Sequence, residues 1–203
     1  TYVEVVSAAR VDDVWVAQVR DTDTGATFEV RAHTIVNAAG PFVDGLNDGF
    51  DVSTDHKIVF SKGIHLVVPR LTTTDHDRVL AFFDDTKRLF YVIPMGRRSV
   101  IGTTDTRVDE AYTLVTDEDR DFLLSQINAR LQLDTPLTPA DVIAERTGVR
   151  PLVVQRPRRT GDREDWADVE WTSLSRKHEI ETDHDRGVVT VFGGKLTDCL
   201  NVG

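Results

Sequence analysis

Strand-like runs separated by tight turns constrain most what this chain can fold into. From position 2 to 30 the β-branched and aromatic residues follow a period of two, and Asp and Gly residues at 11–13 and 21–25 supply the hairpin turns. This pattern predicts a three-stranded meander. A short apolar run at 34–37 then ends in Ala38-Ala39-Gly40-Pro41, which is typical of a buried strand that ends in a turn with close backbone approach.

The middle of the chain carries a second set of strand-like runs. They are separated by turn residues at 84–86 and 95–97, and they lie at 57–60, 64–69, 78–83, 88–93 and 99–103. Because their connections are short, they predict a second sheet that is mostly antiparallel. Further strands are predicted at 142–153, 171–181 and 187–192, with a loop in the charged stretch 156–165.

One clear helix is predicted at 116–131. Thr116 precedes three acidic residues, which favour a helix N-terminus, and apolar residues recur at helical spacing along the rest of the segment. We expect this acidic first turn to be solvated. Thr138-Pro139 is typical of a further single turn, and residues 195–202 are predicted to begin another helix.

The chain begins inside a predicted strand, without methionine, and stops within the helix predicted after Gly193-Gly194. A strand, a glycine turn and a helix form a unit whose helix normally runs for several turns. We therefore expect these 203 residues to be a piece of a longer protein. The function has to be argued for that longer protein.

Composition excludes several classes of protein. The chain has 24 basic and 34 acidic residues, a net charge of −10, which disfavours general binding of nucleic acid. Its single cysteine, Cys199, excludes an internal disulfide and a Cys-rich zinc site and favours a reducing compartment. The six histidines lack metal-ligand spacing, and no apolar run approaches the roughly 18 residues that span a bilayer. We predict no metal site, no nucleic-acid partner and no transmembrane segment.

Three short motifs carry candidate site residues. Gly193-Gly194-Lys195-Leu196-Thr197 lies between a strand and a helix, where glycines admit a ligand and free N–H groups attract an anion or a carbonyl oxygen. Gly148-Val149-Arg150-Pro151 places an arginine at a strand end, where its planar fork can bind a carboxylate or phosphate. His65, at the start of a strand, can act as acid, base or hydrogen-bond donor. For each motif a plain structural role is the alternative: a Gly-Gly turn, a surface ion pair and a surface histidine.

In their order and spacing these segments resemble the FAD-dependent glycerol-3-phosphate dehydrogenases. The shared segments are 36–41, 62–70, 101–105, 148–152 and 192–197, and the resemblance covers nearly the whole chain apart from 155–168. The Gly-rich dinucleotide fingerprint of that family is absent and would precede residue 1. Asp198 stands where the family frequently has a small residue.

The resemblance implies an α+β fold in two parts. An antiparallel β-sheet substrate domain with a flanking helix, like that of D-amino-acid oxidases, would occupy 51–182. A partial FAD-binding domain of glutathione-reductase type would comprise 1–50 and 183–203. It would lack central parallel strands, which leaves sheet edges open to pairing with another copy of the chain. We expect no bound flavin and no activity from these 203 residues alone.

The resemblance also implies roles for the candidate residues. Arg150 would bind the substrate phosphate or orient the carbinol beside the flavin, His65 would assist proton removal in the same cavity, and Lys195 would lie at both flavin and substrate. The implied cofactor-binding residues are Ala38, Ala39, Gly40, Gly193, Gly194, Lys195, Leu196 and Thr197.

The implied reaction oxidises sn-glycerol 3-phosphate to dihydroxyacetone phosphate by hydride transfer to FAD, and the electrons then pass to a quinone or, in the oxidase branch, to oxygen. A cytoplasmic protein is implied, with peripheral attachment to the inner membrane face left open.

Two alternative functions stay open. Another flavin oxidase of the same fold would use Arg150 to hold the carboxylate of an amino or 2-hydroxy acid, and a non-catalytic β-rich interaction domain would have no site at all.

Overall fold

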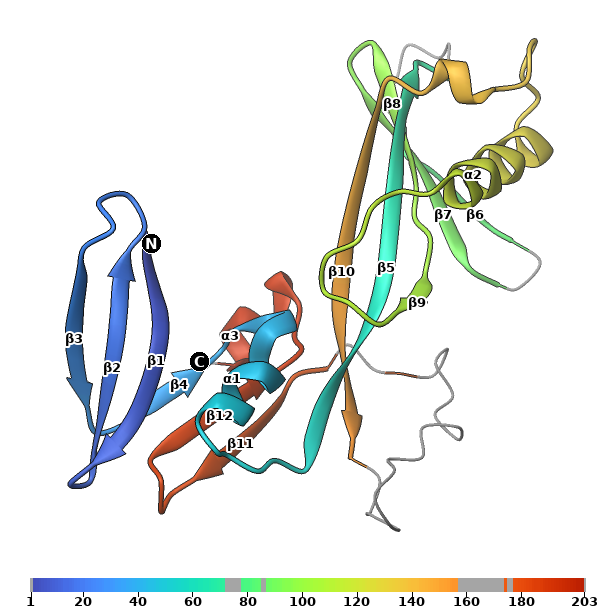
Figure 1. Cartoon of the computed structure of the whole chain (residues 1–203). Helices are drawn as coiled ribbons and strands as arrows, with labels where there is room; N and C mark the ends of the chain where they lie inside the picture. The colour runs from blue at the N-terminus through green and yellow to red at the C-terminus, as the bar shows by residue number, and fades with distance from the viewer. Residues whose placement is uncertain (1, 72–77, 85–86, 157–173, 175–176, 203) are drawn as a thin grey trace. The chain divides into compact units, whose positions relative to one another are not determined.

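The computed structural model describes residues 2–71, 78–84, 87–156, 174 and 177–202. These residues form two compact units: unit 1 is Thr1–Val59 with Pro151–Gly203, and unit 2 is Phe60–Arg150. The fold is mixed α and β with three sheets, and strands make up most of it (Figure 1). Both unit limits lie inside the predicted substrate domain 51–182, and the functional limits of the domains stay a prediction.

The first sheet of unit 1 is the predicted meander. Its strands are β1 (Val3–Val11), β2 (Val14–Asp21) and β3 (Thr27–Ala32), paired antiparallel in the order β1-β2-β3. Asp12 and Asp13 adopt positive φ angles in the first turn, and Gly25 does so in the second. Glycine and aspartate tolerate this backbone conformation better than most residues, which is why they stand at the turns.

The second sheet of unit 1 joins segments from both ends of the chain. Its order is β11 (Glu179–Asp183), β12 (Val188–Phe192) and β4 (Ile35–Asn37), with β12 antiparallel to β11 and parallel to β4. Of the strand predicted at 171–181, residues 171–173 and 175–176 lie outside the described residues, and the strand begins only at Glu179. After β12, the predicted helix is present as η4 (Leu196–Asp198) and α3 (Cys199–Val202).

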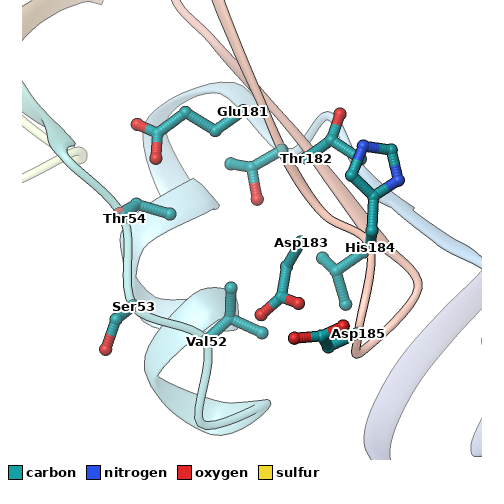
Figure 2. A pocket seen from close by; sticks show the side chains of 10 residues that line it. Val52, Ser53, Thr54, Glu181, Thr182, Asp183, His184 and Asp185 are labelled. Carbon is teal, nitrogen blue, oxygen red and sulfur yellow. The ribbon is translucent and has the colours of Figure 1, made fainter.

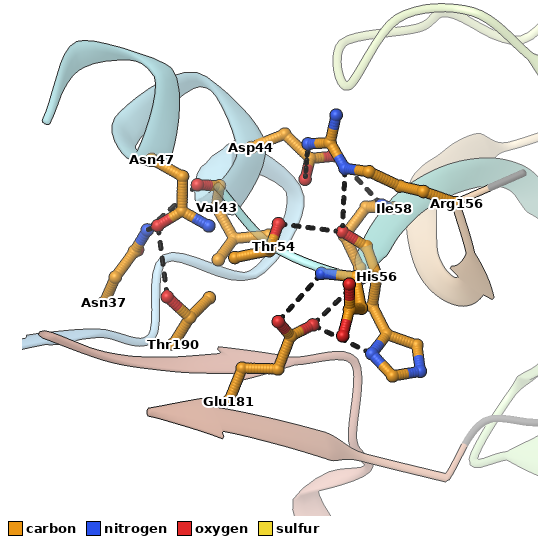
Figure 3. A network of polar contacts seen from close by, with 11 residues as sticks. Asn37, Val43, Asp44, Asn47, Thr54, His56, Ile58, Arg156, Glu181 and Thr190 are labelled. Atoms are coloured by element: carbon orange, nitrogen blue, oxygen red, sulfur yellow. Dashed lines mark hydrogen bonds and ion pairs between the residues drawn. The ribbon is translucent and has the colours of Figure 1, made fainter. Parts of the chain in front are cut away.

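A short helix after β4 is not predicted by the sequence pattern. The 3-10 turn η1 (Gly40–Phe42) leads into α1 (Val43–Gly49), whose two glycines and one asparagine are poor helix formers. Asn47 of α1 is fully buried, and its side-chain oxygen accepts hydrogen bonds from Asn37 of β4 at 2.8 Å and from Thr190 of β12 at 3.1 Å (Figure 3). Tertiary contacts therefore fix a helix that intrinsic propensity disfavours.

A small aromatic core joins the meander to the rest of unit 1. Trp15, Phe50, Val52 and Val188 are buried together, and the rings of Trp15 and Phe50 lie 5.6 Å apart between centroids. The Trp15 indole N–H donates to the carbonyl oxygen of Arg186 at 2.7 Å. This bond satisfies the one polar group that the buried indole carries.

Unit 2 contains the antiparallel sheet that the strand runs predict. Its order is β10-β5-β8-β7-β6, with β9 paired to β5. The strands are β5 (His56–Pro69), β6 (Leu80–Phe83), β7 (Leu89–Met95), β8 (Arg98–Gly102), β9 (Thr106–Val108) and β10 (Ala144–Gln155). The separate strands predicted at 57–60 and 64–69 are one long strand, because pairing first with β9 and then with β8 carries β5 through Ser61-Lys62-Gly63. The sequence does not predict β9, whose three residues are too few to show an alternating pattern.

The predicted helix is α2 (Asp117–Arg130), and it packs on one face of this sheet. The core of unit 2 consists of Ile64, Leu66, Val68, Phe90, Val92, Ile101, Leu123, Leu124 and Ile127. Because side chains alternate along a strand, Gly63, His65 and Val67 lie on the opposite face. The predicted single turn is η2 (Pro139–Asp141). None of the helices in the described ranges is long and apolar enough to cross a membrane.

The acidic first turn of α2 is not fully solvated, contrary to the expectation. Asp119 is only 8% exposed, and its carboxylate accepts a hydrogen bond from the Lys62 ammonium group at 2.5 Å. Burial raises the pKa of Asp119, but the hydrogen bonds from Lys62 and Thr116 outweigh burial, so this pKa lies below its ordinary value. The ion pair connects β5 to the N-terminus of α2.

Truncation of a core residue on α2 should destabilise unit 2. Ile127 is fully buried, so Ile127→Ala removes apolar contacts and leaves a cavity, with an expected loss of about 2–5 kcal/mol in the free energy of unfolding. Urea denaturation followed by circular dichroism measures this loss. Asp121→Ala, on the exposed face of the same helix, is the control and should change the free energy by less than about 0.5 kcal/mol. Equal effects of the two substitutions would contradict the core assignment.

Candidate functional site

Arg150 lies on β10 with its guanidinium group packed over a glycine of the neighbouring strand β5. A Cβ atom on Gly63 would lie 2.2 Å from Nη2 of Arg150, so the glycine leaves room for this group. Nη2 donates to Oγ1 of Thr103 at 2.8 Å, and Nη1 donates to the carbonyl oxygen of Thr104 at 3.1 Å. The side chain is 22% exposed. A partly buried, hydrogen-bonded arginine is held in one orientation, which suits the binding of an anion.

His65 lies on the same face of the sheet as this guanidinium group. It is opposite Gly102 of β8, and Gly102 is opposite Tyr91 of β7. A Cβ atom on Gly102 would lie 2.6 Å from Cδ2 of His65, so a second glycine makes room for the imidazole ring. The face of the sheet away from α2 therefore carries His65 and the Arg150 guanidinium group together.

The protonation state of His65 follows from these surroundings. Burial lowers the pKa of His65, and the positive charges of Arg150 and Arg146 lower it further. The ring is therefore neutral at neutral pH and can accept a proton. Arg150 and His65 together offer a fixed cation and a neutral base.

Several contributors to this arrangement were not assigned a role from the sequence. Gly63, Gly102 and Thr103 lie in segments that the family resemblance picks out, but their contacts arise only when β5, β8 and β10 pair. A glycine inside each of two strand-like runs is the signal that could have found them, because such a glycine often marks a close approach to another group. Thr103 has no comparable signal.

In unit 1 the structure brings two predicted cofactor segments to one edge of the sheet. β4 and β12 run parallel with Asn37 opposite Thr190, so the turns Ala38-Ala39-Gly40 and Gly193-Gly194 follow neighbouring strand ends. Gly40, Gly193 and Gly194 have φ angles of 57°, 63° and 93°, which other residues rarely adopt. The carboxyl ends of parallel strands are where open α/β sheets bind nucleotides.

A polar network holds this edge in place (Figure 3). The side-chain amide of Asn37 donates to Asn47, and its oxygen accepts a hydrogen bond from the main-chain N–H of Ala39 at 3.4 Å. Nearby, the carboxylate of Glu181 accepts hydrogen bonds from the main-chain N–H of His56 at 2.9 Å and from its ring nitrogen Nδ1 at 2.8 Å. The network thus orders the turn after β4 and the start of β5.

The remaining predicted cofactor residues follow the glycine turn. Lys195, Leu196 and Thr197 are all exposed, and Lys195 precedes the first residue of η4. Beside the turn, Nδ1 of His178 and Oδ2 of Asp198 lie 2.6 Å apart. Lys195 belongs to unit 1, whereas Arg150 and His65 belong to unit 2. The structure therefore groups the predicted residues into two sets.

The turn after β4 borders a cavity of about 350 Å³. Its lining is mostly apolar and consists of Val5, Ala17, Ile35, Val36, Asn37, Ala38, Ala39, Leu46 and Phe50. Small side chains at Ala38 and Ala39, followed by a glycine with positive φ, allow a ligand to approach the backbone closely. The turn that carries three of the predicted cofactor residues therefore lies beside an open, mostly apolar cavity.

A larger cavity in unit 1 has a different character (Figure 2). It measures about 480 Å³, and its lining includes Glu181, Asp183 and Asp185. None of the predicted site residues lines this cavity, and its carboxylates repel a phosphate group. Within the part of the chain that the structure describes, no group of three or more His, Cys, Asp or Glu side chains could hold a metal ion.

Comparison with known proteins identifies the family. The model of the FAD dependent oxidoreductase family, DAO, matches residues 1–198. The chain belongs to this family. This FAD-dependent oxidoreductase chain is 36% identical over 185 residues to glycerol-3-phosphate dehydrogenase 2 of Mycobacterium bovis and 30% identical over 204 residues to the mitochondrial glycerol-3-phosphate dehydrogenase of Homo sapiens. The two matches cover 88% and 97% of this chain but only 28% and 26% of those proteins.

Solved structures of flavoproteins resemble this oxidoreductase chain. The glycerol-3-phosphate dehydrogenase from Bacillus halodurans complexed with FAD matches with a TM-score of 0.74 at 30% identity, over 97% of this chain and 36% of that one. L-α-glycerophosphate oxidase from Mycoplasma pneumoniae, with FAD bound, matches with a TM-score of 0.61 at 19% identity, over 95% of this chain and 44% of that one. The second likeness is one of fold alone. The chain therefore spans less than half the length of these relatives.

In this FAD-dependent oxidoreductase chain the pKa of His65 should lie below its ordinary value of about 6.5. Arg150→Met removes a positive charge but keeps a long side chain, so the pKa of His65 should rise. NMR titration of the histidine Cε1 protons measures both values, with Arg97→Met in an exposed turn as the control. A pKa that stays the same or falls in Arg150→Met would contradict the proximity of the two groups.

Gly63→Ala should move Arg150 without unfolding unit 2. The added Cβ meets the tip of a flexible side chain rather than backbone, so the guanidinium group can swing away. We expect the pKa of His65 to rise toward its value in Arg150→Met, while the free energy of unfolding changes by less than about 1 kcal/mol. Gly45→Ala, whose Cβ meets nothing within 4 Å, is the control. Loss of folding, or an unchanged His65 titration, is the outcome that contradicts this role of Gly63.

Proposed function

We propose that the longer protein to which this chain belongs is an FAD-dependent dehydrogenase that oxidises sn-glycerol 3-phosphate to dihydroxyacetone phosphate. The observation that carries the proposal is the guanidinium group of Arg150, held over Gly63 on the same face as the neutral ring of His65. Relatives named glycerol-3-phosphate dehydrogenase, at 30% and 36% identity, support the choice of substrate.

Arg150 provides the anion site in this proposal. Its planar fork can make two parallel charge-assisted hydrogen bonds to a phosphate, and partial burial strengthens them relative to bulk water. Alternatively the same fork orients the C2 hydroxyl of the substrate. A ring nitrogen of His65 accepts the proton of that hydroxyl group. Because protonated His65 lies near the charge of Arg150, it returns the proton to solvent readily.

Unit 1 provides the cofactor site. Ala38-Ala39-Gly40 and Gly193-Gly194 hold the cofactor at the edge formed by β4 and β12, and the main-chain N–H groups of Leu196-Thr197 are available to its carbonyl oxygens. FAD, when bound, supplies the acceptor for the hydride that leaves C2. The ammonium group of Lys195 stabilises negative charge that develops on the substrate oxygen.

A quinone acceptor and a cytoplasmic location, with or without peripheral attachment to the membrane, belong to this proposal. Arg150 itself favours a second candidate function, a flavin oxidase, because a carboxylate can also bind its planar guanidinium group. The substrate would then be an amino acid or a 2-hydroxy acid. If the chain is instead a non-catalytic interaction domain, substitution of Arg150 should change no enzymatic turnover.

Arg150→Ala in the complete, FAD-loaded protein tests the proposal. The value of kcat/KM for glycerol 3-phosphate should fall about 30- to 1,000-fold, which corresponds to roughly 2–4 kcal/mol for charged hydrogen bonds lost in the transition state. Steady-state reduction of a soluble quinone analogue measures this fall. Arg97→Ala, in an exposed turn of the same unit, is the control and should leave kcat/KM unchanged.

Assays with a panel of substrates distinguish the three candidate functions. Strong preference for glycerol 3-phosphate over glycerol, glycine and lactate, with dependence on Arg150, supports the dehydrogenase. Preference for glycine or lactate assigns an oxidase of the second class instead. A fall in kcat/KM of less than about fivefold in Arg150→Ala would show that this arginine is structural.

A further inference from the structure

We infer that Thr103 and Asp105 are positioning residues, which hold the guanidinium group of Arg150 in the orientation that the reaction needs. The inference rests on the proposed function. The segment Thr103-Thr104-Asp105, directly after β8, presents two hydrogen-bond acceptors and one carboxylate to this group. Oγ1 of Thr103 lies 2.8 Å from Nη2, the carbonyl oxygen of Thr104 lies 3.1 Å from Nη1, and Oδ1 of Asp105 forms a longer ion pair with Nη1 at 4.0 Å.

The segment is itself anchored to its neighbours. The main-chain N–H of Ile64 donates to Oγ1 of the buried Thr104 at 3.1 Å. The hydroxyl group of buried Ser61 donates to the carboxylate of Asp105, and Nη2 of Arg88 donates to the carbonyl oxygen of Asp105 at 2.7 Å. The acceptors around the guanidinium group are therefore fixed by contacts that need no ligand.

The carboxylate of Asp105 is badly suited to bind an anionic substrate. It is 47% exposed, and its charge repels a phosphate group bound to the same arginine. Its attraction for Nη1 instead restricts the plane of the guanidinium group. Removal of this charge should therefore loosen the orientation of Arg150 but ease the binding of anions. Orientation acts on kcat, whereas binding acts on KM, so the two effects can be separated.

Asp105→Asn in the complete, FAD-loaded protein should lower kcat for glycerol 3-phosphate about fivefold, as expected for a partly exposed ion pair. KM should stay the same or fall. Thr103→Val removes a neutral acceptor without changing the charge, and kcat should fall about tenfold at similar KM. Asp109→Asn, which removes another exposed carboxylate after β9, is the control and should change neither constant.

A double-mutant cycle shows whether the two residues act through Arg150. In an Arg150→Lys background, Asp105→Asn and Thr103→Val should each change kcat less than about twofold, because the planar fork that they orient is gone. Equal falls in kcat in both backgrounds would overturn the inference. A rise in KM with unchanged kcat in Asp105→Asn would also overturn it.

Measurement of inorganic phosphate binding distinguishes failure of this inference from failure of the proposed function. The Kd of phosphate is measured from the change in flavin absorbance of the complete wild-type protein and of its variants. Arg150→Ala should weaken phosphate binding, whereas Asp105→Asn should leave the Kd unchanged or lower it. If the wild type does not oxidise glycerol 3-phosphate, the proposed function fails, and the cycle is carried out with the panel substrate that is oxidised. Weaker phosphate binding in Asp105→Asn would overturn the positioning role whatever the substrate is.

Discussion

The packing of α2 against one face of the six-stranded sheet decides which side chains the opposite face can offer. Ile64, Leu66 and Val68 of β5 are fully buried on the helix side, so the period of two leaves Gly63 and His65 on the other side. A register slip of one residue would exchange these two sets and place His65 in the apolar core. Burial of these three side chains opposes such a slip, because each exposed aliphatic side chain costs about 1.5–3 kcal/mol. The arrangement of the site therefore depends on hydrophobic packing on the far side of the same strands.

The buried ion pair between Lys62 and Asp119 adds a second constraint on this strand. An intact buried pair contributes little net stability, but removal of one partner costs about 3–5 kcal/mol because it leaves an uncompensated charge. The same carboxylate also accepts a hydrogen bond from the main-chain N–H of Thr116 in the capping box of α2, so its loss would leave that group unpaired as well. The pair therefore specifies where β5 meets the start of α2 more than it stabilises the fold. Since Lys62 directly precedes Gly63, it also fixes the strand position over which the guanidinium group of Arg150 lies.

The sequence predicts regular elements and short motifs well, and it fails where distant contacts decide the structure. The meander and α2 follow from periodicity and turn residues alone. The helix α1 does not, because its glycines disfavour a helix and the buried Asn47 supplies the missing stabilisation through partners on β4 and β12. The continuity of β5 through Ser61-Lys62-Gly63 depends in the same way on two partner strands. At the site, Arg150 and His65 could be selected as reactive residue types in recognisable motifs, but the sequence does not show that a glycine lies under each of them.

Gly63 and Gly193 serve two different physical purposes, which a sequence does not distinguish. At Gly63 the constraint is space: φ is not positive, and the atoms nearest to an added Cβ belong to the tip of the Arg150 side chain. At Gly193 both constraints apply, because φ is 63° and an added Cβ would lie 2.5 Å from Cγ2 of Val153 and 3.3 Å from the carbonyl oxygen of Lys177. A backbone carbonyl cannot move aside as a guanidinium group can, and a side chain at this φ is strained as well. Substitution at Gly63 therefore displaces the guanidinium group of Arg150, whereas substitution at Gly193 acts on the fold of the turn. Gly63 is therefore required by a neighbouring side chain and Gly193 by the backbone, although both lie in segments that carry the family resemblance.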